Sequence, residues 1–246
     1  MTRIPDDKPC GLYGKLPAKG DFVMRRLPPA FVDAWDAWLQ DGMTVSRERF
    51  GESWLDAYLV APIWRFVLPP GLLDPSGVAG VLMPSIDRVG RYFPLTIAAM
   101  VEGVFSPALI AAAAEDWFTA AEGLAILALE DGLDFDRFDE EVAILGTPEA
   151  PPPSAPILHD GETWMLGLHA GMAVGVGMAQ IAQEVLDGAL GPHSVWWTAG
   201  SECVPPCLVI RRGMPGAADF PALIDGLWLP EQEAAAEERN DTEEPA

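Results

Sequence analysis

Residues 84–96 place three charged side chains on one short connection between two apolar runs. Asp87 and Arg88 begin this charged group, and Arg91 ends it after Gly90. A connection between two strands needs Asn, Asp or Gly for its turn geometry, so a pair of arginines exceeds that need. The planar guanidinium group of arginine suits bidentate hydrogen bonds to carboxylates and phosphates. The segment therefore predicts either a partner-binding surface or an internal ion pair that closes the connection.

Further charged residues near the N-terminus could join this group. The fold would create a positive patch if it brought Lys15, Lys19, Arg25 and Arg26 next to Arg88 and Arg91. Otherwise these are separate surface charges with acidic neighbours. We therefore predict a protein-binding face that consists of Lys15, Lys19, Asp21, Asp87, Arg88, Gly90 and Arg91. The alternative hypothesis is that Asp87 or Asp21 pairs with Arg88 or Arg91 inside the protein and holds the connection in place.

Negative charge is concentrated in the later part of the chain. The formal net charge is −22, and residues 101–246 hold 26 acidic residues against 4 Lys and Arg. Residues 1–100 hold 11 of each sign and sum to zero. Such an acidic protein repels nucleic acids and anionic membranes, so we expect neither as a partner.

The sequence also predicts the compartment. No apolar run approaches the roughly 18–20 residues that a membrane-spanning helix needs, so we expect no membrane insertion. The N-terminus lacks an apolar stretch followed by a small-residue cleavage site, so we expect no secretory signal. Cys10, Cys203 and Cys207 are odd in number and do not indicate a disulfide framework. We expect a cytoplasmic protein.

Catalytic and metal-binding patterns are weak. Asp87 could be combined with Ser85 or Ser194 and a distant histidine into a hydrolase triad, but any chain of this size permits such a combination. The three histidines share no metal-ligand spacing, and the acidic stretch at 131–141 does not fit a calcium-binding loop. We expect no catalytic residues, no metal and no cofactor.

Trp196 and Trp197 stand side by side in a strand-like segment. Successive residues of a strand face opposite sides of the sheet, so one ring should be buried and the other should lie on the opposite face. A helix could cover that second ring in a sheet with two covered faces. Otherwise the ring is a docking surface, where Trp is enriched. We include both tryptophans in the predicted protein-binding site.

The order of predicted elements is a strand, two helices, three strands, two helices, a strand, a helix, two strands and a helix. This order is typical of an α/β fold with a mixed, largely antiparallel sheet and helices on both faces, which is a three-layer α-β-α arrangement. We predict a single domain over residues 1–230. Residues 231–246 contain seven acids and one arginine and predict a disordered acidic tail.

Several segments of the sequence resemble a known family. They are GLYGKLPAKGDF at 11–22, WDAWL at 35–39, APIWRF at 61–66, GVLMPSIDRVGRYFPLT at 80–96 and SVWWTAG at 194–200. They are similar to the TagF (ImpM) family of accessory proteins of type VI secretion. The first hundred residues carry most of this resemblance, and the block at 80–96 is its most specific part.

The resemblance implies a cytoplasmic, non-enzymatic regulator that represses assembly or firing of the secretion machine after translation. It also implies that the partner is the forkhead-associated (Fha) scaffold protein of that machine. Two alternatives remain open. The protein could be a small hydrolase that uses the loop with Asp87, Arg88 and Arg91, or a structural or chaperone-like component of the secretion apparatus.

Overall fold

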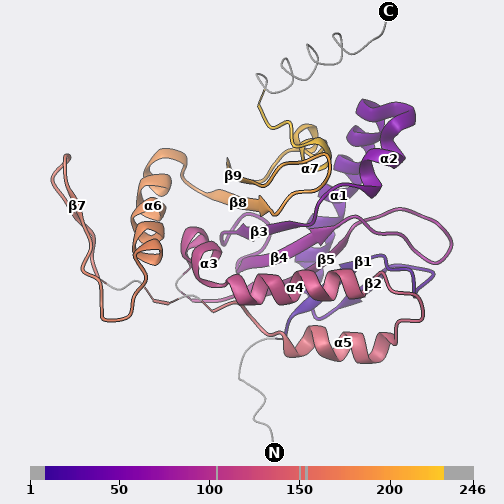
Figure 1. The fold of residues 1–246 in the computed structure, drawn as a ribbon, viewed down its shortest axis with the longest axis horizontal. Coiled ribbons are helices and arrows are strands. Elements are labelled where there is room, and N and C mark those ends of the chain that lie inside the picture. Colours follow the sequence, from indigo (N-terminus) through magenta and orange to yellow (C-terminus); the bar gives the residue numbers. More distant parts are fainter. Residues whose placement is uncertain (1–8, 104, 150, 153–154, 230–246) are drawn as a thin grey trace, which may run out of the picture.

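Seven antiparallel strands form a sheet at the centre of the molecule (Figure 1). The computed structural model describes residues 9–103, 105–149, 151–152 and 155–229. The strand order is β2-β1-β5-β4-β3-β8-β9, and every pairing between neighbouring strands is antiparallel. The strands are β1 (Gly11–Gly14), β2 (Val23–Arg25), β3 (Trp64–Leu68), β4 (Gly77–Met83), β5 (Leu95–Val101), β8 (His193–Thr198) and β9 (Cys207–Arg212).

The central strands are buried on both faces. All residues of β3 and β4 are buried, which explains why β4 is a continuous apolar run and why β3 is apolar apart from Arg65. Successive residues contribute to two separate cores: Phe66 points to one face of the sheet and Val67 points to the other. The predicted α/β fold with covered faces is therefore confirmed, and the acidic tail predicted at 231–246 lies outside the described residues.

The first face of the sheet is covered by α1 (Pro29–Phe50), together with α2 (Trp54–Leu59), α7 (Ala222–Asp225) and the 3₁₀ turns Gly51–Ser53 and Ala217–Asp219. Proline at the first position of α1 suits a helix start, because its missing N–H would have no partner there. The helix buries apolar residues at every fourth position: Phe31, Trp35, Leu39 and Met43. The indole N–H of Trp35 donates to Thr96 Oγ1 on β5 at 2.8 Å and fixes the helix on the sheet.

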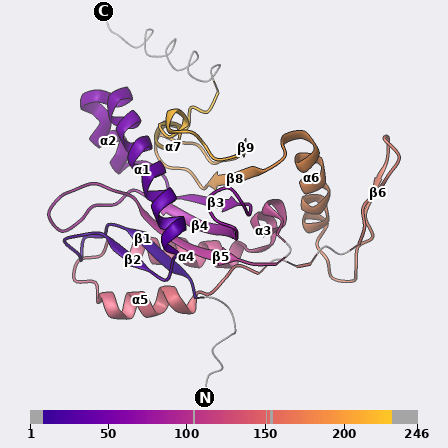
Figure 2. The same cartoon turned by 180° about the vertical axis from the view of Figure 1, so that it is seen from behind.

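The opposite face carries α3 (Pro107–Ala113), α4 (Glu115–Leu127) and α5 (Phe135–Ile144) (Figure 2). The sequence predicts one helix from 106 to 129, but the backbone leaves helical geometry at Ala114 and divides it in two. Arg65 of β3 fixes α4 to the sheet, since its buried guanidinium donates to Glu122 and Glu115 at 2.8 Å each. The hydrogen bond from Arg65 lowers the pKa of the Glu115 carboxyl.

One part of the chain extends away from these layers. Helix α6 (Val174–Leu190) and the two-stranded hairpin β6 (Leu158–His159) and β7 (Trp164–Met165) lie beyond α3 at one end of the molecule (Figures 1 and 2). Within the part of the chain that the structure describes, none of the helices has the length and hydropathy of a membrane-spanning segment.

The two adjacent tryptophans lie in the two cores. Trp196 is fully buried, and its ring is parallel to that of Trp35 at 6.3 Å. Trp197 is half-buried on the other face, where its ring meets Phe118 of α4 edge-on at 4.6 Å. Helices thus cover both rings, which was the first of the two alternatives for this pair. The inclusion of Trp196 in a protein-binding site was wrong, because its side chain has no exposed surface for a partner.

The burial of Trp196 predicts the effect of truncating it. Trp196→Ala should lower the free energy of unfolding by about 3–5 kcal/mol, because it removes a large ring from a packed core and leaves a cavity. Urea denaturation measures this loss. Leu208→Ala on the neighbouring strand is the control: Leu208 is 62% exposed, so its truncation should change stability by no more than about 0.5 kcal/mol. Equal effects of the two changes would contradict the packing described here.

Candidate functional site

A buried carboxylate organises the connection between β4 and β5. The side chain of Asp87 has no exposed surface. Its Oδ1 accepts hydrogen bonds from the backbone N–H groups of Val89 and Arg91 at 3.0 and 2.9 Å. Its Oδ2 lies 2.7 Å from Arg91 Nε and 3.1 Å from Lys15 Nζ. The carboxylate is therefore fully satisfied by two cations and two amides, as burial of a charge requires.

The turn itself follows from the residue types. The Gly90 N–H donates to the Asp87 carbonyl oxygen at 3.0 Å, and Gly90 has a φ of 88°. This left-handed conformation favours glycine, because a side chain there would meet the backbone. Asp is also common at such turns, since its carboxylate accepts from the N–H group two residues later. The structure thus gives Gly90 a role in the backbone of the connection.

The same group of contacts ties this connection to residues 15–22, a segment distant in sequence. Ser85 Oγ donates to the carbonyl oxygen of Lys15 at 2.7 Å. Arg91 Nη2 donates to the carbonyl oxygen of Gly20 at 2.7 Å, and the Arg88 N–H donates to that of Lys19 at 2.9 Å. The two segments therefore form one structural unit, which we call the Asp87 clamp: Lys15, Ser85, Asp87 and Arg91 with the backbone of residues 19–20.

The environment of Asp87 fixes its charge. Burial raises the pKa of this carboxyl. The hydrogen bonds from Arg91, Lys15 and Val89 outweigh that effect and hold the pKa well below its usual range. The carboxylate therefore stays ionised and is a weak base, so its chemistry is that of an ion-pair partner.

Beside the clamp, an open hollow presents positive charge to solvent. It is lined by the side chains of Lys19, Asp21, Phe22, Arg25 and Arg88. Arg88 is exposed, and no acidic side chain among the described residues pairs with its guanidinium. The ammonium group of Lys19 lies 4.0 Å from the ring centre of Phe135, and Arg25 is 3.8 Å from a carboxylate oxygen of Asp139. We call this surface the cationic hollow.

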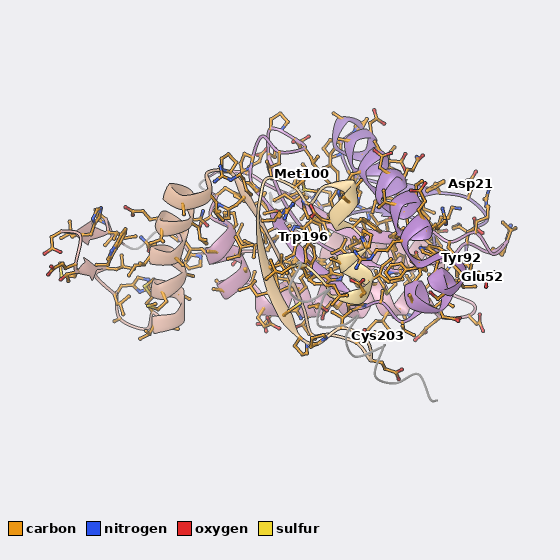
Figure 3. All side chains as sticks on the ribbon, turned by 90° about the horizontal axis from the view of Figure 1, so that it is seen from above. Asp21, Glu52, Tyr92, Met100, Trp196 and Cys203 are labelled. Carbon is orange, nitrogen blue, oxygen red and sulfur yellow. The ribbon has the colours of Figure 1, made fainter. Side chains whose placement is uncertain are left out.

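The structure divides the predicted site residues into three groups. Lys15, Asp87 and Arg91 form the clamp, which is the internal ion pair of the alternative hypothesis. Lys19, Asp21 and Arg88 line the hollow and are available to a partner. The tryptophans lie elsewhere: Figure 3 shows Trp196 in the middle of the molecule and Asp21 at one end.

Two residues of the hollow were absent from the predicted site. Phe22 is 43% exposed and stacks on Tyr13 at 5.9 Å, while Arg25 comes from strand β2 at the edge of the sheet. The sequence shows that Arg25 is basic. It does not show that the short strand β2 pairs with β1, and this pairing is what brings Arg25 to the hollow.

The two serines considered for a triad with Asp87 make structural hydrogen bonds instead. Ser85 donates to a carbonyl oxygen of the clamp, and the hydroxyl of Ser194 donates to the carbonyl oxygen of Gly213 at 2.7 Å. Asp87 accepts from cations and backbone amides. Within the described ranges, no cluster of three or more His, Cys, Asp and Glu residues has the geometry of a metal site.

The chain is similar to known proteins in both sequence and structure. Residues 11–145 match the TagF N-terminal domain, which is described as type VI secretion system-associated. The chain is also similar to a solved structure, the protein PA0076 of Pseudomonas aeruginosa PAO1. The two share 38% sequence identity with a TM-score of 0.74, over 88% of this chain and 94% of that one. No protein with a curated description matches the chain.

The Asp87 clamp predicts a characteristic dependence of stability on pH. Asp87→Asn should lower the melting temperature at neutral pH, because it leaves the buried Lys15 ammonium without its anionic partner. The folded-state pKa of Asp87 lies below the unfolded value of about 3.9. The stabilisation is therefore complete above that pH and is lost as the pH falls through the folded pKa. In melting curves recorded from pH 7 down to acid, the difference in melting temperature between the wild type and Asp87→Asn should shrink.

Asp21→Asn provides the matched control. The Asp21 side chain is 86% exposed, and its Oδ1 is as far as 3.9 Å from Arg91 Nη2, so this ion pair is weak. Neutralising Asp21 should therefore leave the melting temperature nearly unchanged. A drop in melting temperature for Asp21→Asn as large as that for Asp87→Asn would contradict the assignment of the clamp.

Proposed function

Since this chain belongs to the TagF family of type VI secretion system-associated proteins, we propose that it is a regulator of type VI secretion that acts by binding another protein. The proposed partner is the forkhead-associated scaffold protein of the secretion machine. In this proposal the chain works in the cytoplasm, without catalysis, and represses assembly or firing of the machine by occupying the scaffold.

The cationic hollow is the observation that carries the proposal. Arg88 reaches solvent from a connection whose backbone is held on both sides by the Asp87 clamp. Because the backbone of Arg88 is fixed, binding need not order the loop, and the arginine fork pairs with carboxylate or phosphate groups. Arginine and aromatic side chains are also the residue types most often found at the energetic centre of interfaces, and Phe22 lies beside Arg88.

Charge makes this surface distinct from the rest of the molecule. The protein has a formal net charge of −22, so most of its surface repels an acidic partner. The hollow gathers Lys19, Arg25 and Arg88 in one place and supplies the attraction that would orient such a partner. An acidic or phosphorylated surface of the scaffold is the chemistry that this hollow fits.

The contacts of the clamp support a non-enzymatic role. A general base must accept a proton near the working pH, and the lowered pKa of Asp87 makes it unsuited to that task. The Ser85 hydroxyl, the nearest candidate nucleophile in sequence, donates to a backbone carbonyl. The clamp is thus built to hold two loops together.

Size-exclusion chromatography with the scaffold protein from the same gene cluster tests the proposal. The wild-type protein should co-elute with the scaffold in a stoichiometric complex at low and physiological salt. Arg88→Ala should weaken the complex about tenfold or more, as loss of a central arginine contact does, without a change in melting temperature. The matched control is Arg137→Ala, which removes a 78% exposed arginine side chain on α5, outside the hollow.

Each outcome decides part of the proposal. Absence of a complex at both salt concentrations would overturn direct binding to the scaffold. If Arg88→Ala and Arg137→Ala weaken the complex equally, the scaffold is still the partner, but the cationic hollow is not the surface that binds it.

A further inference from the structure

Helix α6 turns an apolar stripe toward solvent. The stripe contains Val174, Met178, Ile181 and Val185, whose spacing of four, three and four residues places them on one side of the helix. Val174, Met178 and Val185 are 67%, 60% and 47% exposed, and Ile181 between them is half-buried. A surface helix of a globular protein normally turns such a stripe toward the core, so this exposed arrangement is typical of an interaction site.

The other sides of α6 are already occupied. Gln183 accepts hydrogen bonds from the Ala108 N–H at 3.0 Å and from the Ser106 hydroxyl at 3.2 Å, at the start of α3. Gln180 donates to the carbonyl oxygen of Ala155 at 2.9 Å. The helix also packs closely against residue 168 at Gly177, where a Cβ would lie 2.8 Å from the Leu168 side chain. These contacts fix the rotation of α6 and leave the stripe on its outer side.

The hairpin beside α6 adds apolar surface. Leu158 of β6 and Met165 of β7 are paired across the hairpin, so they lie on the same face, and each is 57% exposed. In Figure 1 the hairpin and α6 together form one end of the molecule, and Figure 3 shows Asp21 at the other end. This surface is therefore separate from the cationic hollow and does not depend on the function proposed for the hollow.

Charge indicates what kind of molecule would cover the stripe. The hairpin and α6, over residues 158–190, contain four acidic residues and no Lys or Arg: Asp160, Glu162, Glu184 and Asp187. Asp187 accepts a hydrogen bond from Gln183 on the inner side of α6, and Arg212 of β9 donates to the Ala189 carbonyl oxygen at the C-terminal end of the helix. A second copy would bring two acidic surfaces together, which is unfavourable. The terminal segments 1–8 and 230–246 contain no comparable series of large apolar residues. An anionic membrane is repelled for the same reason as a second copy.

We propose that the α6 stripe is the docking site for a basic amphipathic helix of a partner protein. The apolar side of that helix would pack on Val174, Met178, Ile181 and Val185, and a flanking Lys or Arg residue would face Glu184, which is exposed beside the stripe. This is helix-on-helix recognition through anchors at three- and four-residue spacing. The stripe extends over roughly 17 Å at a rise of 1.5 Å per residue, which is about three turns of the partner helix.

Two labelled synthetic peptides test this proposal on the full chain by fluorescence anisotropy. Both have leucine at the a and d positions of a heptad repeat. One has lysine at the remaining positions, and the other has glutamate. The lysine peptide should bind, and the glutamate peptide should not. The double variant Met178→Ser/Val185→Ser should weaken binding of the lysine peptide about tenfold or more, because it removes two apolar anchors.

Ile144→Ser is the matched control, since Ile144 is 82% exposed on α5 and its loss should leave peptide binding unchanged. If the lysine peptide binds the double variant as tightly as the wild type, the proposal is overturned, because the overall negative charge of the protein would then explain the binding without the stripe. Should the double variant fail to fold, Glu184→Gln must reduce both the affinity for the lysine peptide and its salt dependence. An unchanged salt dependence in that variant would also overturn the proposal.

Two further outcomes would replace the partner helix with another occupant. Light scattering that finds a wild-type dimer, dissociated by Met178→Ser/Val185→Ser, would show that a second copy covers the stripe. Sedimentation of the wild-type protein, but not of the double variant, with phosphatidylcholine vesicles would show a membrane contact. Either result would overturn the proposal.

Discussion

The buried ion group of Asp87, Lys15 and Arg91 is the interaction on which the end of the molecule with the cationic hollow depends. A carboxylate without exposed surface is tolerated only when cations and amides satisfy it. Here both amides and Arg91 come from the connection itself, and Lys15 comes from a segment distant in sequence. The carboxylate therefore has two effects. It fixes the turn between β4 and β5, and it joins that turn to the segment after β1.

The clamp allows a clear division of roles among similar residues. Arg91 is committed to Asp87 and Gly20, whereas Arg88, three residues earlier, projects into the open hollow with Lys19 and Arg25. The first arginine stabilises the loop and the second is available for recognition. The internal ion pair, one of the two alternatives at the level of sequence, is present, and the surface proposed for partner binding involves different residues.

The sequence predicted the fold better than the site. The apolar runs around residues 78–83 and 95–101 are strands, as predicted, and they are continuously apolar because both faces of the sheet are covered. The adjacent tryptophans predicted rings on opposite faces but left open what covers the second ring. Helical periodicity could not predict the break at Ala114, since the apolar pattern continues through it. The separate roles of Arg88 and Arg91, and the outward rotation of α6, depend on contacts between distant segments that one sequence does not contain.

Amide hydrogen exchange over residues 84–94, in the wild type and in Asp87→Asn, shows whether the Asp87 carboxylate holds this connection. We expect slow exchange of the Val89 and Arg91 amides in the wild type, because the Asp87 carboxylate accepts from both. In the variant we expect much faster exchange of these two amides, with protection of the β4–β5 ladder retained. Equal exchange in both proteins would contradict the claim that this carboxylate holds the loop and presents Arg88.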